Sequence, residues 1–157
     1  MCGALEDATG LTVKPNQLGM MSTIEINGLH LPQTLIRALE DGTWAEAGKD
    51  WFAVFPPQEI GRPELFRIDL MRQINGEWRR REMPVIFYGV ADGSAMPGAL
   101  DPERSLLIGE VENEALFGLD YRDRGASPSV VFLNTYVRWV EIAGSFDEFW
   151  RRLTGGI

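Results

Sequence analysis

The sequence is poor in the residues that catalytic and metal sites most often need. Its 157 residues include one histidine, His30, and one cysteine, Cys2. A Ser-His-Asp triad would have to use His30, and no G-x-S-x-G motif accompanies it. One cysteine and one histidine are too few for a typical zinc site, and neither a P-loop nor a G-x-G-x-x-G motif is present. We therefore expect no catalytic residues, no cofactor and no metal.

Long apolar runs are also missing. No stretch approaches the roughly 20 apolar residues that a membrane-spanning helix needs. The N-terminus has no basic region followed by an apolar core, as a secretion signal would have. Cys2 has no second cysteine with which to form an internal disulfide, which is typical of reducing compartments. These absences predict a cytoplasmic protein with no membrane partner.

What is present is the composition of a folded, acidic protein. Hydrophobic residues make up 45% and charged residues 24%, close to the averages of soluble globular domains. The formal net charge is −8, and an acidic surface repels nucleic-acid phosphates and attracts basic partners. We therefore expect no direct nucleic-acid ligand. Two interpretations of the charge stay open, namely a surface for a basic protein and charge that only confers solubility.

The first half of the chain predicts few regular elements. Residues 1–20 mix glycine, proline, threonine and asparagine without periodicity, so we expect a flexible lead-in before a single domain over residues 21–157. Alternating isoleucines predict a strand over 22–29. A helix is expected to begin at Pro32 and to end before Gly42, because proline suits the first helical position and glycine the position after the last.

The middle of the chain predicts strands. Residues 51–56 form a short aromatic run, and residues 65–74 alternate apolar with polar side chains, which indicates a strand with one wet face. Asn75-Gly76 is typical of a type I′ turn. It predicts a hairpin whose return strand begins with residues 77–81. A glycine- and proline-rich loop is expected over 91–102.

The last third carries the clearest pattern. Polar and acidic turns separate four apolar runs, which predict strands over 106–111, 115–122, 129–135 and 138–143. A helix is expected to follow, because Ser145 and Glu148 have the spacing of a capping box. The apolar residues after the cap recur at helical spacing on one face, at Phe146, Phe149, Trp150 and Leu153.

The last third contains a series of short motifs, namely Leu107-Ile108-Gly109, Leu119-Asp120-Tyr121-Arg122, Pro128, Val130-Val131-Phe132-Leu133, Trp139, Ile142-Ala143, Ser145-Phe146 and Glu148-Phe149. Their order and spacing resemble the SUKH superfamily, which is named partly for a yeast cell-wall-assembly regulator. The resemblance covers about the last third of the chain, and Leu31-Pro32 with its helix resembles the family's N-terminal LP helix. Asp41-Gly42-Thr43 departs from the asparagine-glycine-glycine usual after that helix.

This resemblance implies an α+β domain, with an antiparallel sheet of about five or six strands, helices packed on one side and a C-terminal helix. It agrees with strands that cluster in sequence and helices at the ends. Most family members are non-catalytic binding modules, and many bacterial ones are immunity proteins that neutralise polymorphic toxins. The expectation is therefore an immunity protein that binds its toxin stoichiometrically. The alternative is a cytosolic regulator or adaptor linked to cell-wall or envelope synthesis.

Acidic and aromatic side chains near the turns are the candidate contacts for a protein partner, possibly a basic toxin domain. Alternate glutamates from 110 to 114 would repel one another on one strand face unless a basic group lay across them. The alternative, which we favour, is that Asn113 centres a turn that splays them into water. The candidate residues are Glu110, Glu112, Glu114, Asp123, Tyr136 and Trp139.

Two further alternatives concern these candidates. Trp139 lies in a strand of the resemblance, and its large apolar area favours a place in the core over a contact surface. Paired carboxylates could also serve a small hydrolase, which is the least favoured class.

Overall fold

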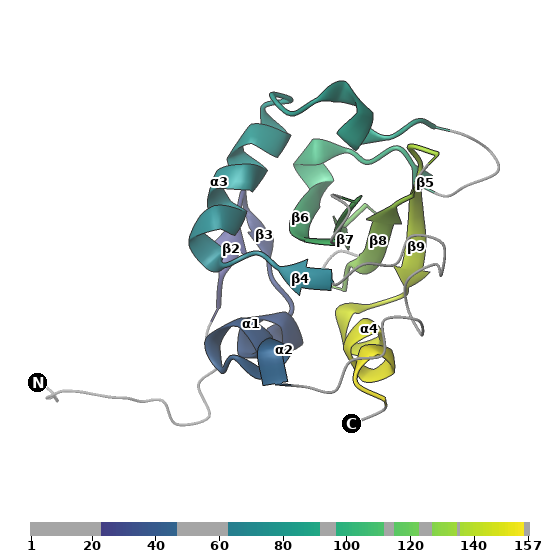
Figure 1. The fold of residues 1–157 in the computed structure, drawn as a ribbon. Helices are drawn as coiled ribbons and strands as arrows, with labels where there is room; N and C mark the ends of the chain where they lie inside the picture. Colours follow the sequence, from purple (N-terminus) through teal and green to yellow (C-terminus); the bar gives the residue numbers. More distant parts are fainter. Residues whose placement is uncertain are drawn as a thin grey trace, which may run out of the picture.

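The computed structural model describes residues 23–46, 63–91, 97–111, 115–122, 127–134 and 136–155. Within them, six strands form one antiparallel sheet (Figure 1). The strands are, in spatial order, β4 (Pro63–Leu65), β6 (Ser105–Val111), β7 (Ala115–Asp120), β8 (Ser129–Leu133), β9 (Trp139–Ala143) and β5 (Pro97–Gly98). The predicted α+β class is confirmed, as are the four strands of the last third.

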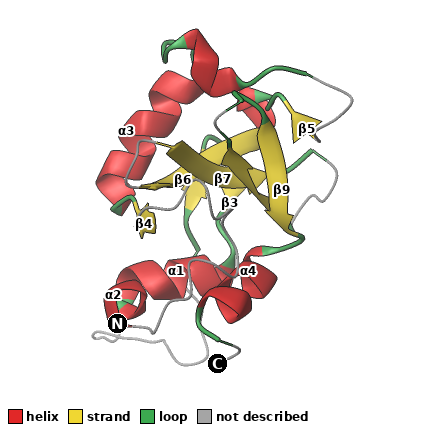
Figure 2. Cartoon of the chain, turned by 45° about the vertical axis from the view of Figure 1, so that its right-hand side comes forward, coloured by secondary structure: helices red, strands yellow, loops and turns green. Residues whose placement is uncertain are grey.

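Two short helices and the C-terminal helix lie together at one side of the sheet (Figure 2). They are α1 (Gln33–Glu40), α2 (Thr43–Glu46) and α4 (Phe146–Leu153). The rings of Trp44 and Trp150 lie 5.8 Å apart between α2 and α4. Helix α1 ends before Gly42, as the sequence predicts, and Gly42 has a φ of +69°. The helix begins one residue later than predicted, because Pro32 is its N-cap rather than its first helical residue.

The predicted cap of α4 is confirmed at Ser145, whereas the return bond to Glu148 comes from Gly144, the residue before the N-cap. The Ser145 hydroxyl accepts a hydrogen bond from the Glu148 amide at 3.1 Å, and the Glu148 carboxylate accepts one from the Gly144 amide at 3.0 Å. Phe146, Phe149 and Leu153 are buried, so the predicted apolar face packs into the core.

The strands predicted between residues 65 and 81 are wrong. This segment contains α3 (Ile68–Arg79), followed by the 3-10 helix η3 (Val85–Tyr88). Met71, Asn75 and Trp78 are fully buried, and their spacing of four and three residues is helical. The apparent alternation is misleading because Leu70, which it assigns to the buried side, is 41% exposed.

The type I′ turn lies instead at Asn27-Gly28, where both residues have positive φ values of 55° and 82°. It joins β2 (Glu25–Ile26) to β3 (Leu29–His30), whose residues pair antiparallel across it. The segment 22–29, predicted as one strand, therefore lies in a β-hairpin whose turn has two residues.

Side chains of α4 and α3 contact opposite faces of the sheet. Phe117 of β7 shares a face with Val140 of β9 through the strand register, and Phe149 of α4 packs there at 5.9 Å. Trp139, adjacent to Val140, faces the other way. Trp78 of α3 meets it there at 6.2 Å.

Helix α3 also replaces a strand along the edge of β6. After β4 ends, the Asn75 side chain donates to the Leu107 carbonyl and accepts from the Leu107 amide, both at 2.8 Å. Trp78 Nε1 donates to the Ser105 hydroxyl at 3.0 Å. These bonds satisfy edge groups that would otherwise be buried without partners.

Some expectations fall elsewhere. The lead-in over 1–20 and the aromatic run over 51–56 lie outside the described residues. Within the part of the chain that the structure describes, no helix has the length and apolarity needed to cross a membrane. The predicted loop over 91–102 contains β5 and the start of the 3-10 helix η4 (Pro102–Arg104).

Candidate partner-binding groove

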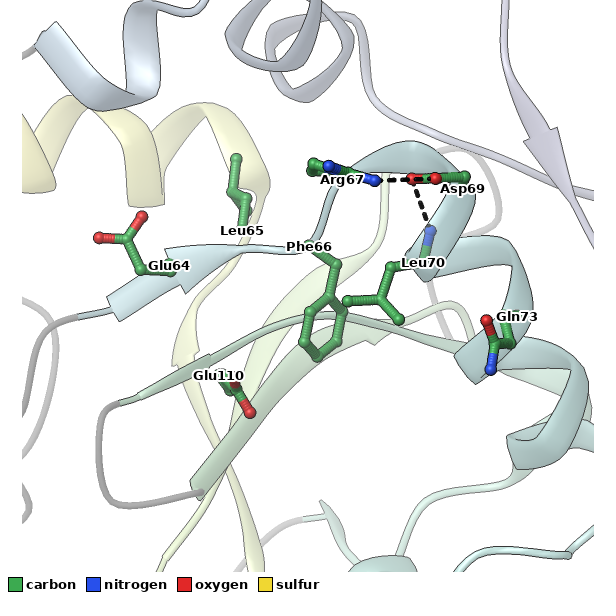
Figure 3. Close-up of a pocket in the computed structure, with 8 residues that line it drawn as sticks. All are labelled: Glu64, Leu65, Phe66, Arg67, Asp69, Leu70, Gln73 and Glu110. Carbon is green, nitrogen blue, oxygen red and sulfur yellow. Dashed lines mark hydrogen bonds and ion pairs between the residues drawn. The ribbon is translucent and has the colours of Figure 1, made fainter.

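An open groove lies where β4 meets β6 and α3 begins (Figure 3). Its volume is about 530 Å³. Side chains from all three elements line it, so the groove exists only because residues 63–73 pack on the edge of the sheet. The lining residues are Glu64, Leu65, Phe66, Arg67, Asp69, Leu70, Gln73 and Glu110.

Gly109 allows β4 to approach β6 closely. It is opposite Leu65 in the register. A Cβ atom at this position would lie 2.3 Å from the Glu64 carbonyl oxygen and 2.5 Å from the Phe117 ring. Any larger residue would therefore displace β4 or the ring. The pairing continues past the strand, because the Phe66 amide donates to the Ile108 carbonyl at 2.9 Å.

The same register places two carboxylates opposite each other. Glu64 of β4 and Glu110 of β6 are cross-strand partners, and both are exposed. Glu64 Oε1 accepts a hydrogen bond from Trp44 Nε1 at 3.2 Å. Like charges directly opposite each other on a sheet are unfavourable, so this pair would be relieved by a positively charged group lying between them.

A third carboxylate lies at the start of α3. Asp69 accepts hydrogen bonds from Arg67 Nη2 and from the Leu70 amide, both at 2.9 Å. The Arg67 hydrogen bond, together with the one from Leu70, holds the pKa of Asp69 below its ordinary value. Asp69 thus stays ionised and matches the charge of Arg67.

The groove also has an apolar wall, beside the Arg67–Asp69 pair and Gln73. Phe66 is buried and Leu65 is half-buried, while Leu70 is 41% exposed beside them. A lysine or arginine side chain has an apolar stem and a charged head. The groove has the matching arrangement of an apolar wall and two exposed carboxylates.

The predicted contact residues separate in the structure. Glu110 lines the groove, and Tyr136, 72% exposed, lies in the turn between β8 and β9. Glu112, Glu114 and Asp123 lie outside the described residues.

Trp139 has to be removed from the predicted contacts. It is fully buried and its Nε1 donates to the Phe87 carbonyl at 2.8 Å, so the interpretation of this residue as core is the correct one. Sequence reasoning missed Glu64, because nothing local to residues 63–65 indicates which strand they pair with.

The other polar features of the sequence lie elsewhere. His30 is on the surface hairpin, with its Nε2 atom 3.1 Å from a Glu25 carboxylate oxygen. Among the described residues, no group of three or more histidine, cysteine, aspartate and glutamate side chains is arranged to hold a metal ion.

Comparisons with models of protein families, with curated proteins and with solved structures give no significant match to this chain.

Proposed function

We propose that this protein is a binding protein without catalytic activity, which acts by stoichiometric contact with a basic protein partner. The specific form of the proposal is an immunity protein that blocks a toxin domain. The observation that carries it is the cross-strand pair of Glu64 and Glu110 in an open groove with an apolar wall, an arrangement that suits the apolar stem and charged head of a lysine or arginine.

The charge of the whole chain supports the same proposal. A net charge of −8 attracts a basic partner over distances of about the Debye length and raises the association rate. The apolar wall of the groove would then contact the stem of the inserted side chain, so the contact would not depend on charge alone.

The resemblance to SUKH proteins supports the choice of a toxin as the partner. The alternative within that resemblance, a regulator of envelope synthesis, would use the same groove on a different partner. The two proposals predict different effects of altering the groove. An immunity protein would lose protection against the toxin, whereas a regulator would lose control of envelope synthesis.

Co-expression tests the immunity proposal. The full chain is produced together with the protein encoded by the neighbouring reading frame, and survival of the host is counted. We expect the wild-type chain to protect. The double variant Glu64→Gln/Glu110→Gln should protect less.

The matched control is Glu40→Gln/Glu103→Gln, which removes the same charge from two exposed positions outside the groove and should protect fully. Survival that does not depend on the wild-type chain would remove the immunity proposal. Equal protection by both double variants would instead remove the groove as the contact site.

A further inference from the structure

A second surface, which is apolar rather than acidic, lies around η3 and is called the η3 surface below. Its apolar side chains are Val85, Ile86, Val90 and Tyr136, which are 82%, 55%, 50% and 72% exposed. Among the described residues they are four of the five large apolar side chains that are exposed. Large apolar side chains that are exposed close to one another mark interaction sites, whereas single ones are normal on a protein surface.

Two chain segments form this η3 surface together. The Val90 amide donates to the Val137 carbonyl at 3.0 Å, which joins the segment after η3 to the β8–β9 turn. In that turn, Asn134 Oδ1 accepts hydrogen bonds from the amides of Tyr136 and Arg138, at 2.9 and 3.1 Å. The backbone that carries Tyr136 is thus fixed by its own hydrogen bonds.

Contacts with two buried tryptophans hold η3 in place. Tyr88 stacks on Trp78 with ring centroids 4.4 Å apart, and the Phe87 carbonyl accepts the Trp139 indole N–H. The apolar side chains are therefore displayed on a rigid support. A partner that binds here would not have to order the backbone, which lowers the entropic cost of binding.

Backbone strain is concentrated at the same place. Of the described residues other than glycine, Arg81, Val137 and Asn27 have positive φ, at 58°, 62° and 55°. Asn27 is in a turn where asparagine is favoured, but a β-branched valine in this region is unfavourable. Such strain persists where function requires a particular backbone, and both strained residues flank the η3 surface.

The charge of the η3 surface is opposite to that of the chain. Segments 80–90 and 136–138 contain three arginines and one glutamate. Arg80 pairs with Glu82 at 3.0 Å, and the Arg81 guanidinium lies 5.5 Å from the centre of the Tyr88 ring. The complement of this surface is therefore apolar and acidic.

We infer that the η3 surface binds a protein partner whose contact face is apolar and acidic, independently of the acidic groove. Tyrosine and arginine are enriched at protein interfaces. An anionic lipid bilayer is disfavoured as the binding partner because the chain as a whole has a net charge of −8, which an anionic surface repels. A symmetric contact with a second copy would bring like-charged arginines together.

The two surfaces lie at opposite ends of the strand order. The groove is beside β4, whereas the η3 surface is beside β9 and β5, where Gly89 bridges to Ala99 next to β5. One molecule would therefore be able to hold a basic and an acidic partner at once, which goes beyond the proposed stoichiometric binding of one toxin.

Selection from a random peptide library displayed on phage, with the full chain as bait, tests this inference. Enriched peptides are synthesised and their affinities measured by fluorescence anisotropy. We expect peptides that combine acidic and aliphatic or aromatic residues. The double variant Val85→Ser/Tyr136→Ser should bind them at least about tenfold more weakly. The control Leu70→Ser changes an exposed leucine in the groove and should bind them normally.

The altered side chains are exposed, so the thermal midpoint of each variant should match that of the wild type and exclude a folding defect. The inference is overturned if no enriched peptide is sensitive to Val85→Ser/Tyr136→Ser, or if the sensitive peptides are basic. It is also overturned if the double variant instead abolishes self-association in sedimentation velocity, or co-sedimentation with phosphatidylserine vesicles. Failure of the groove variants to affect protection would leave this result unchanged.

Discussion

Residues 105–153 and residues 63–91 are held in place in different ways. In the first region each strand pairs with the next one along the chain, from β6 to β9. In the second region the anchoring contacts reach the sheet, from Asn75 to Leu107 and from Trp78 to Ser105. The first region therefore follows from its own residue pattern, whereas the second depends on the surface against which it packs.

The acidic groove lies at the junction of these regions. Glu64 comes from residues 63–91 and Glu110 from residues 105–153. A groove of this kind should be sensitive to any change that detaches the first region from the sheet, and substitutions at the anchors test this dependence.

The largest effect is expected at Trp78, which is fully buried, stacks on Tyr88 and meets Trp139 edge-on. Trp78→Ala should lower the free energy of unfolding by about 3–5 kcal/mol, because it leaves a large cavity. It also removes the hydrogen bond that the Ser105 hydroxyl accepts, although this hydroxyl still donates to the Asp101 carbonyl. Urea denaturation followed by circular dichroism measures it. Trp78→Phe should cost less, since it keeps most of the burial. A loss below about 1 kcal/mol for the alanine variant would contradict the anchoring role.

A smaller but still large effect is expected at Asn75. Asn75→Ala removes the hydrogen bonds to Leu107 and to the Met71 carbonyl, and leaves buried backbone groups unsatisfied. The cost should be about 2–4 kcal/mol. The loss of overall stability alone would accelerate hydrogen exchange of the Leu107 amide to some extent. We expect a larger acceleration, because this amide also loses its own hydrogen bond to Asn75. Gln73→Ala, an exposed position on the same helix, is the control, and unchanged protection of Leu107 in Asn75→Ala would refute the edge-capping role.

The smallest effect on stability at neutral pH is expected at Tyr121, which ties residues 105–153 to the hairpin β2–β3. Its hydroxyl donates to the His30 carbonyl at 2.6 Å. Tyr121→Phe should cost about 1 kcal/mol, the net value of one hydrogen bond.

Tyr121 also makes stability depend on alkaline pH. Burial raises the pKa of Tyr121 above its ordinary value of 10.0. Because the pKa is raised in the folded protein, neutral Tyr121 contributes its full stabilisation of the fold below pH 10.0. This stabilisation is lost as the pH rises beyond that value, since the unfolded chain then loses the tyrosine proton more readily than the folded protein. Denaturation midpoints should therefore fall above this pH in the wild type and fall less in Tyr121→Phe. Tyr136→Phe changes an exposed tyrosine and should follow the wild type; parallel curves for all three proteins would rule out this linkage.

The contrast between the regions also explains which parts of the fold the sequence predicts. Strands β6 to β9 and helix α4 are correctly predicted, because turn residues, apolar runs and the Ser145–Glu148 cap all indicate the same elements. Residues 65–81 are predicted wrongly because two local signals mislead. The alternation over 65–74 is fortuitous, and Asn75-Gly76 resembles a hairpin turn although Asn75 is buried in a helix to satisfy Leu107.

The site shows the same limit of local reasoning. Glu110 is predicted from its place beside an acidic turn, but its partner Glu64 depends on the pairing of β4 with β6. The approach of these strands requires Gly109, and in the sequence this glycine is noticeable only as part of the motif Leu107-Ile108-Gly109. When two short segments far apart in the sequence pair with each other, the residue pattern of neither segment indicates its partner.

The acidic groove is tested most directly by titrating the full chain into the purified toxin domain in a calorimeter at several salt concentrations. We expect binding with one-to-one stoichiometry that weakens as salt is added. Glu64→Gln/Glu110→Gln should bind about tenfold more weakly and with a smaller salt dependence, since two contacts to charged groups contribute about 1 kcal/mol or less each. Glu40→Gln/Glu103→Gln should retain the wild-type affinity. Equal affinities and equal salt dependence for all three proteins would contradict the proposal that this groove is the binding site.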